Sequence, residues 1–94
     1  MYLLRPVRAE LADAPTDGEL EVLGAHFAYL ERLRDAGRLI VAGPSVVEGD
    51  PFGLVVLEFE QEAEALAAME SDPAVAEGVM AAELRPLRLS VVRS

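Results

Sequence analysis

Two short segments of this chain, 39–42 and 54–57, are apolar at every position. Successive side chains of a β-strand point to opposite faces, so each segment divides its apolar residues between two faces. The alternating pairs are Leu39 and Val41 against Ile40 and Ala42, and Val55 and Leu57 against Leu54 and Val56. A face in contact with water would be polar at every second position. We therefore predict a sheet with apolar cover on both faces.

The second cover is expected to come from another copy of the chain. The 94 residues fit a single domain, here 1–94, because soluble domains commonly hold roughly 100 to 150 residues. A chain of this size buries a modest core, although 52% of its residues are hydrophobic. Pairing of two uncovered sheet faces would bury the remaining apolar surface. The sequence thus predicts a homodimer through the open sheet face.

Local signals place the elements in the order strand, helix, strand, strand, helix, strand. Thr16 and Glu19 form a capping box that opens a helix, and Gly37 suits its C-terminal end. Gly43-Pro44 ends a strand, and Asp72-Pro73 starts a further helical turn. The expected strands cover 2–8, 38–45, 52–60 and 83–93, with a hairpin loop at 48–51, and the expected helices cover 17–36, 61–70 and 73–80.

This order predicts an α+β, ferredoxin-like βαββαβ fold, in which two split βαβ units build a four-stranded antiparallel sheet with both helices on one face. Helical periodicity then selects the inward-facing residues. In the first helix they are expected to be Val22, Leu23, His26, Phe27, Leu30 and Leu33, and in the second Ala63, Leu66, Ala67 and Met69.

Charge and composition exclude several classes of function. Seventeen acidic against eight basic residues give a net charge of −9, which disfavours binding to nucleic acid or to anionic membranes. The chain has no cysteine, and therefore no disulfide or thiolate chemistry. Its N-terminal residues lack a secretory signal, and no apolar run approaches the roughly 20 residues of a membrane span. We expect a cytoplasmic protein.

His26 is the only histidine of the chain. An imidazole titrates near neutral pH and can serve as a general acid or base. A single histidine without neighbouring ligand spacing does not make a metal site, so no metal or cofactor is expected. The alternative for His26 is a structural histidine satisfied by one hydrogen bond.

The residues around His26 follow a recognisable order. His26, Tyr29-Leu30, Leu33 and Gly37 are followed by Gly43-Pro44, Gly53, Asp72-Pro73 and Arg85-Pro86. Over nearly the whole chain this resembles the YciI-like (YCII-related) family. The resemblance implies a dimeric α+β barrel and a His–Asp pair beside the sheet, proposed as an acid/base dyad, which corresponds here to His26 and Asp72. Family members often carry an aromatic residue after the Asp-Pro pair, where this chain has Ala74.

Asp72 has a second reading as a plain helix N-cap, and both roles can coexist because a carboxylate has two oxygens. A carboxylate beside an imidazole fixes its tautomer and stabilises the imidazolium. Gly43, Pro44 and Ser45 could bring backbone and a hydroxyl group close to a small ligand, or form a simple turn. Arg5 could hold an anionic substrate, or be a solvated surface residue.

Two functions follow as hypotheses. In the first, a small dimeric enzyme uses His26 and Asp72 for metal-independent proton transfer on a small organic molecule, in an isomerase or lyase type of reaction. In the second, a noncatalytic module binds a small ligand or another protein, and the histidine is structural. The discriminating observation is a cavity between His26, Asp72 and Arg5: if side chains fill this space, binding and catalysis there both lose their basis.

Overall fold

Four strands form one antiparallel sheet in the order β2-β3-β1-β4 in the computed structural model, which describes residues 1–11, 13–45 and 52–87. The strands are β1 (Tyr2–Pro6), β2 (Leu39–Pro44), β3 (Gly53–Leu57) and β4 (Met80–Leu84). The helices are α1 (Asp17–Asp35), α2 (Glu62–Ser71) and α3 (Pro73–Ala76), with a 3₁₀ turn at Ala9–Leu11. Each strand is antiparallel to its neighbours, as the sequence predicts.

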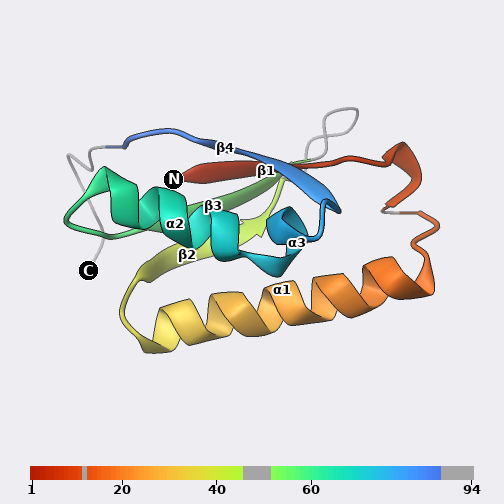
Figure 1. Ribbon diagram of the computed structural model, residues 1–94, viewed down its shortest axis with the longest axis horizontal. Coiled ribbons are helices and arrows are strands. Elements are labelled where there is room, and N and C mark those ends of the chain that lie inside the picture. Colours follow the sequence, from red (N-terminus) through yellow and green to blue (C-terminus); the bar gives the residue numbers. More distant parts are fainter. Residues whose placement is uncertain (12, 46–51, 88–94) are drawn as a thin grey trace.

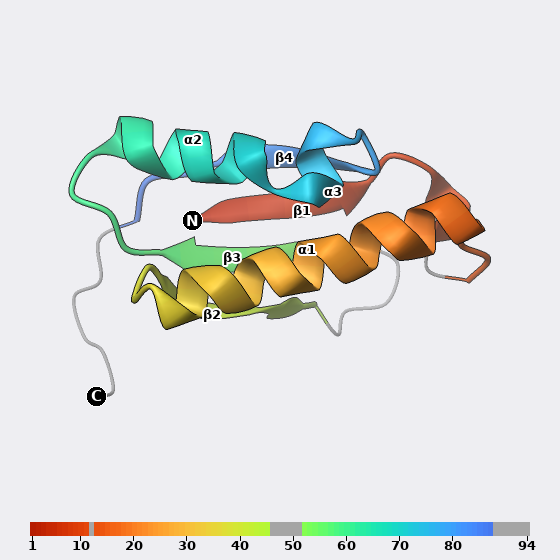
Figure 2. The same cartoon turned by 60° about the horizontal axis from the view of Figure 1, so that its bottom comes forward.

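The helices lie on one face of this sheet (Figure 1). A second view shows α2 and α3 over β1 and β4, and α1 over β2 and β3 (Figure 2). The order places β3 between β1 and β2, and β1 between β3 and β4, so each βαβ unit is split by a strand of the other. The predicted α+β, ferredoxin-like fold is confirmed.

The ends of α1 form as their sequence predicts. The hydroxyl group of Thr16 accepts a hydrogen bond from the Glu19 backbone, while the Glu19 side chain accepts one from the Thr16 backbone. Gly37 follows the helix with φ of 76°, a left-handed conformation that glycine adopts without steric cost. The start and the end of α1 are thus determined locally.

The core lies between the helices and the sheet, around Tyr2, Leu4, Leu30, Val55 and Met69. The pairing of Tyr2 with Val55 puts both on the helix side of the sheet. The opposite side carries Leu3 paired with Leu54, and Val41 paired with Val56. Val41 is 53% exposed. Apolar residues therefore occupy the uncovered face as well.

Strand β2 departs from simple alternation. Its register shifts between Leu39 and Val41, where Leu39 pairs with Leu57 but Val41 pairs with Val56. This bulge puts Leu39 and Ala42 together against the core, so the predicted pairing of Leu39 with Val41 on one face is wrong. A bulge adds one residue to one strand, and every later side chain changes face.

The buried face of α2 also differs from the prediction. Ala68 and Met69 are buried, as Met69 was expected to be, whereas Ala63, Leu66 and Ala67 are exposed. Asp72 follows the helix and is fully buried, and residues three and four positions before it share its side of the helix. The buried side of α2 therefore leads directly into the buried Asp72. In α1, Phe27 is 60% exposed, against the prediction that it is buried.

The last strand begins earlier than predicted, at Met80 instead of residue 83. Gly78 has φ of 71° and turns the chain directly from α3 into β4. Met80, Ala81 and Ala82 favour helix locally, but pairing with β1 overrides this preference. The predicted hairpin loop at 48–51 and the end of the predicted strand, 88–93, lie outside the described residues. Within the described residues, no helix combines the length and hydrophobicity needed to cross a membrane.

Candidate functional site

His26 and Asp72 meet between α1 and the start of α3. The Nδ1 atom of His26 lies 2.7 Å from Oδ1 and 2.9 Å from Oδ2 of Asp72. His26 is 5% exposed and Asp72 is fully buried. The two residues that the resemblance pairs are therefore in direct contact, in a setting shielded from water.

Asp72 has two further hydrogen-bond donors. The hydroxyl group of Tyr2 donates to Oδ2 at 2.8 Å, and the backbone N–H of Ala74 donates to Oδ1 at 3.0 Å. Asp72 therefore caps α3 and contacts His26 at the same time. Burial, together with the charge of Asp72 and its hydrogen bond, raises the pKa of Tyr2 well above its ordinary value, so the Tyr2 hydroxyl group stays a donor.

Sequence reasoning missed Tyr2 as a member of this group. The available signal was strand alternation, which puts Tyr2 on the same side of β1 as the core residue Leu4. A buried tyrosine hydroxyl group usually has a hydrogen-bond partner. Nothing local to residue 2 identifies Asp72 as that partner, because 70 positions separate the two.

A cavity of about 620 Å³ opens between α1 and the strands β1, β2 and β3. Its volume lies within the range of small-molecule sites. His26 lines the cavity, whereas Asp72 and Tyr2 are not among its lining residues. Since Nδ1 is bonded to Asp72, Nε2 is the ring nitrogen that can meet a ligand. Nε2 of His26 is thus the atom of the pair through which a proton can pass to or from a ligand.

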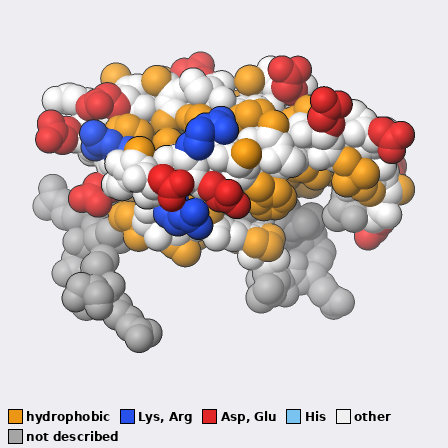
Figure 3. All heavy atoms as spheres, turned by 90° about the horizontal axis from the view of Figure 1, so that it is seen from below, with side chains coloured by type: hydrophobic (Ala, Val, Ile, Leu, Met, Phe, Trp, Pro, Cys, Tyr) orange, Lys and Arg blue, Asp and Glu red, His pale blue; other side chains and the backbone are white. Residues whose placement is uncertain are grey.

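The walls of the cavity are mostly apolar, with Leu23, Leu30 and Val55 among them. Leu20 and Phe27 also line it, although each is more than half exposed. Figure 3 views the molecule from the side of α1, where hydrophobic side chains alternate with charged ones across the surface. Phe27 therefore borders the cavity instead of filling the core, which accounts for its exposure.

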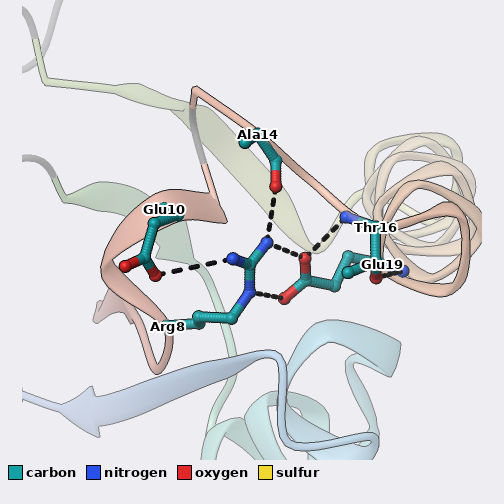
Figure 4. A network of polar contacts seen from close by, with 5 residues as sticks. All are labelled: Arg8, Glu10, Ala14, Thr16 and Glu19. Atoms are coloured by element: carbon teal, nitrogen blue, oxygen red, sulfur yellow. Dashed lines mark hydrogen bonds and ion pairs between the residues drawn. The ribbon is translucent and has the colours of Figure 1, made fainter.

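One end of the cavity is formed by the segment between β1 and α1, where Leu11 and Pro15 are lining residues. Arg8 ties this segment to α1 (Figure 4): its Nε donates to Glu19 at 3.0 Å, and an Nη donates to the Ala14 carbonyl at 2.7 Å. The hydrogen bond from Arg8, followed by that from the Thr16 backbone, lowers the pKa of Glu19 to about 2. This end of the cavity is thus held in place by a charged group that stays ionised.

The remaining predicted binding residues are divided between two places. Gly43 and Pro44 line the main cavity. Ser45 lines a smaller hollow, and its Oγ accepts a hydrogen bond from the Phe52 backbone at 3.2 Å. Arg5 alternates with the core residue Leu4 and so belongs to the opposite face of the sheet, and its guanidinium group stacks at 5.4 Å on Phe52, which itself lines the main cavity. The structure therefore does not bring Arg5 to His26.

Ala74, the residue at which the sequence departs from the family pattern, is fully buried and does not line the cavity. Its backbone serves the site by donating to Asp72. Among residues 1–11, 13–45 and 52–87, no three carboxylate or imidazole side chains gather as metal ligands would. The site is therefore built from one imidazole, one carboxylate and the groups that orient them.

Comparisons with known proteins give a family and a fold. A family model described as the YCII-related domain matches residues 2–87. The proteins named YciI from Escherichia coli O6:H1 and Shigella flexneri are each 43% identical over 68 residues, which cover 64% of this chain and 69% of each relative. The structure of 5-chloro-2-hydroxyhydroquinone dehydrochlorinase (TftG) from Burkholderia phenoliruptrix, in complex with 2,5-dihydroxybenzoquinone, aligns with a TM-score of 0.61. It is 22% identical and covers 92% of this chain and 94% of that chain, a similarity of fold.

Proposed function

This chain belongs to the YCII-related domain family, and we propose that it catalyses proton transfer on a small organic molecule, with Nε2 of His26 as the base and Asp72 as its partner. One observation carries the proposal: the only histidine lines a cavity while a buried carboxylate holds its other ring nitrogen. The reaction would be of an isomerase or lyase type.

The arrangement suits this chemistry for two reasons. A carboxylate that accepts from Nδ1 orients the ring and stabilises the imidazolium that forms when Nε2 takes a proton. Both residues are buried, and shielding from water strengthens the electrostatic interaction between a charged ring and the carboxylate. The structural neighbour TftG is named as a dehydrochlorinase and is complexed with a small ring compound, which supports a reaction on a molecule of this size.

The proposal is tested by proton exchange. We expect the α-protons of 2-tetralone, an apolar enolisable ketone, to exchange in D₂O faster with the protein than without it, as followed by ¹H NMR. His26→Gln should lower this acceleration by roughly 10²- to 10⁴-fold, the usual contribution of a general base. Tyr29→Phe is the matched control, because the Tyr29 hydroxyl group donates to the Ala68 carbonyl and not to the dyad. Equal acceleration by the wild type and His26→Gln would refute the role of His26.

The alternative function, a noncatalytic module with a structural histidine, has its own support. Asp72 caps α3 and accepts from Tyr2, so the group contributes to the fold whether or not it reacts. In this case the cavity would bind a small molecule without changing it. Binding of 2-tetralone that shifts the ring signals of His26, with no exchange above background, would select this alternative.

We further propose that the protein is a homodimer, in which the second copy covers the open face of the sheet. The support is the row of apolar side chains on that face, among them Leu3, Val41, Leu54 and Val56. A cytoplasmic location is consistent with the proposal and stays a prediction.

A further inference from the structure

The polar groups of the cavity are few and unevenly placed. Among the described residues, the charged or polar side chains that line it besides His26 are Glu31 and Arg34, both exposed on α1. Arg34 already pairs with Asp35, at 3.3 Å between Nε and Oδ1. His26 lies two helical turns away from Arg34 and is 5% exposed. Within 1–11, 13–45 and 52–87, the one buried polar side chain that a bound molecule meets is therefore His26.

The hydrogen bonds of Asp72 assign the tautomer of this histidine. Oδ2 takes the hydroxyl hydrogen of Tyr2, and Oδ1 takes the backbone hydrogen of Ala74. Both partners are donors, so the carboxylate acts as the acceptor toward His26 as well. Its 2.7 Å contact with Nδ1 then requires the hydrogen on Nδ1, which leaves Nε2 of the neutral ring with a lone pair. The ring nitrogen that His26 has left for a ligand in the cavity is therefore, in the neutral ring, an acceptor.

Charge gives a second restriction. An anionic ligand would lose its hydration against apolar walls, and the buried charge nearest to it would be the negative carboxylate of Asp72 behind the ring. The net charge of −9 adds repulsion at longer range. A neutral ligand meets neither cost.

We infer that the cavity selects a neutral molecule with an apolar body and a hydroxyl group that donates a hydrogen bond to Nε2 of His26. The inference rests on the proposed function, because it names the substrate class of the same site. A weakly acidic hydroxyl group, such as that of a phenol or an enol, satisfies Nε2 in the ground state and places a transferable proton on it. An ether of equal size leaves the acceptor without a partner, at the cost of an unsatisfied polar atom once the ligand has displaced water.

Three naphthalene probes separate these properties: 1-naphthol is neutral and donates, 1-methoxynaphthalene is neutral and does not donate, and 1-naphthoate is anionic. Their dissociation constants are measured at neutral pH from the fluorescence of the ring. We expect 1-naphthol to bind about tenfold more tightly than 1-methoxynaphthalene, the value of one hydrogen bond, and 1-naphthoate to bind most weakly. Equal binding of the two neutral probes, or tightest binding of the anion, would overturn the inference.

His26→Phe supplies the matched control, because it keeps a ring at the position and removes the acceptor. The advantage of 1-naphthol over 1-methoxynaphthalene should disappear, and an advantage that persists would trace to the extra methyl group and refute the role of Nε2. If this variant does not fold, ¹⁵N NMR of the wild type decides, since the single histidine gives one pair of ring signals. The neutral ring should show hydrogen on Nδ1, and 1-naphthol alone should shift the Nε2 signal; hydrogen on Nε2 would contradict the inference.

The two proposals fail separately. Loss of the 1-naphthol preference, with proton exchange still dependent on His26, would refute the ligand class and leave the function standing. A clear 1-naphthol preference without any exchange would refute the catalytic function and retain a hydroxyl-binding cavity.

Discussion

At the scale of residues, one carboxylate organises the site. Asp72 contacts His26 from α1 and Tyr2 from β1, and it caps the helix that follows it. Each oxygen accepts from donors in fixed positions, so the imidazole has a defined orientation. Removal of the Tyr2 hydroxyl group takes away one of these hydrogen bonds and leaves the packing of the Tyr2 ring intact.

Tyr2→Phe is expected to lower the free energy of unfolding by about 1 to 3 kcal/mol at neutral pH, because the fully buried Asp72 loses a charge-assisted hydrogen bond. Urea titration measures this change. The raised pKa of Tyr2 adds a dependence on pH: the neutral phenol stabilises the fold below the ordinary pKa of 10.0, and this stabilisation is lost as the pH rises above it.

Tyr2→Phe should therefore lose less stability than the wild type between neutral pH and pH values above 10.0. Tyr29→Phe is the comparison, since the pKa of Tyr29 is also raised by burial, although its hydroxyl group bonds to the Ala68 carbonyl. Identical alkaline stability curves for the wild type and Tyr2→Phe would contradict this account.

At the scale of elements, α1 divides its apolar side chains between the core and the cavity. Leu30 is 7% exposed and belongs to the core cluster, whereas Phe27 is 60% exposed and lines the cavity. Helical periodicity places both on one arc and does not separate these roles. The distinction depends on how closely the sheet approaches each turn of the helix.

Leu30→Ala is expected to lower the free energy of unfolding by about 2 to 5 kcal/mol, the usual cost of a cavity in a core. Phe27→Ala should cost less than about 1 kcal/mol, because most of its ring is already in water. Urea unfolding of both variants tests the comparison. If Phe27→Ala proves as costly as Leu30→Ala, the position of α1 over the sheet is wrong.

The segment that joins β1 to α1 depends on the Arg8–Glu19 pair, and this pair predicts a response to acid. The folded-state pKa of Glu19, about 2, lies below its ordinary value of 4.5, so the pair stabilises the fold above pH 4.5 and loses this effect as the pH falls toward 2. Arg8→Gln should reduce stability at neutral pH and flatten the decline between pH 4.5 and 2.

Thermal unfolding at a series of pH values measures this decline. Glu10→Gln is the control, because Glu10 makes only the longer, 3.5 Å contact with Arg8. A decline in Arg8→Gln as steep as that of the wild type would show that Glu19 is not held by Arg8.

At the scale of the whole molecule, the question is what covers the open face of the sheet. Val41 and Val56 lie opposite each other on that face, in β2 and β3. We expect a sedimentation velocity experiment to find a particle of twice the 10.1 kDa chain mass. Val41→Glu should shift it toward the monomer by burying a charge at the contact. Leu66→Glu, on the exposed side of α2, is the control and should leave the particle unchanged.

The parts of the fold that the sequence predicts well are those with local causes. Thr16, Glu19 and Gly37 delimit α1 through contacts within the helix ends, and Asp72-Pro73 starts α3 in the same way. The bulge in β2 and the buried side of α2 depend on distant contacts, those of β2 with β3 and those of α2 with α3 and β4. No pattern near those residues contains this information.

The candidate site likewise combines residues that the sequence identifies with residues that only the folded structure identifies. The contact between His26 and Asp72 agrees with the pairing that the family resemblance implies, whereas Arg5 alternates with the core residue Leu4 and does not line the cavity. The role of Tyr2 could be identified only from the three-dimensional structure, because only the folded chain brings it to Asp72. The resemblance identified the His26–Asp72 pair, and the structure identified the residues that hold it in place.

The contacts of Asp72 span much of the chain: 46 positions separate it from His26 and 70 from Tyr2. The imidazole therefore acquires its orientation only when the first strand, the long helix and the corner before the last strand have all docked. In a partly folded chain the imidazole would lack the contact with Asp72, and the lone pair on Nε2 of His26 would have no fixed position. During refolding, the appearance of the fixed His26 tautomer would thus report that the whole domain has folded.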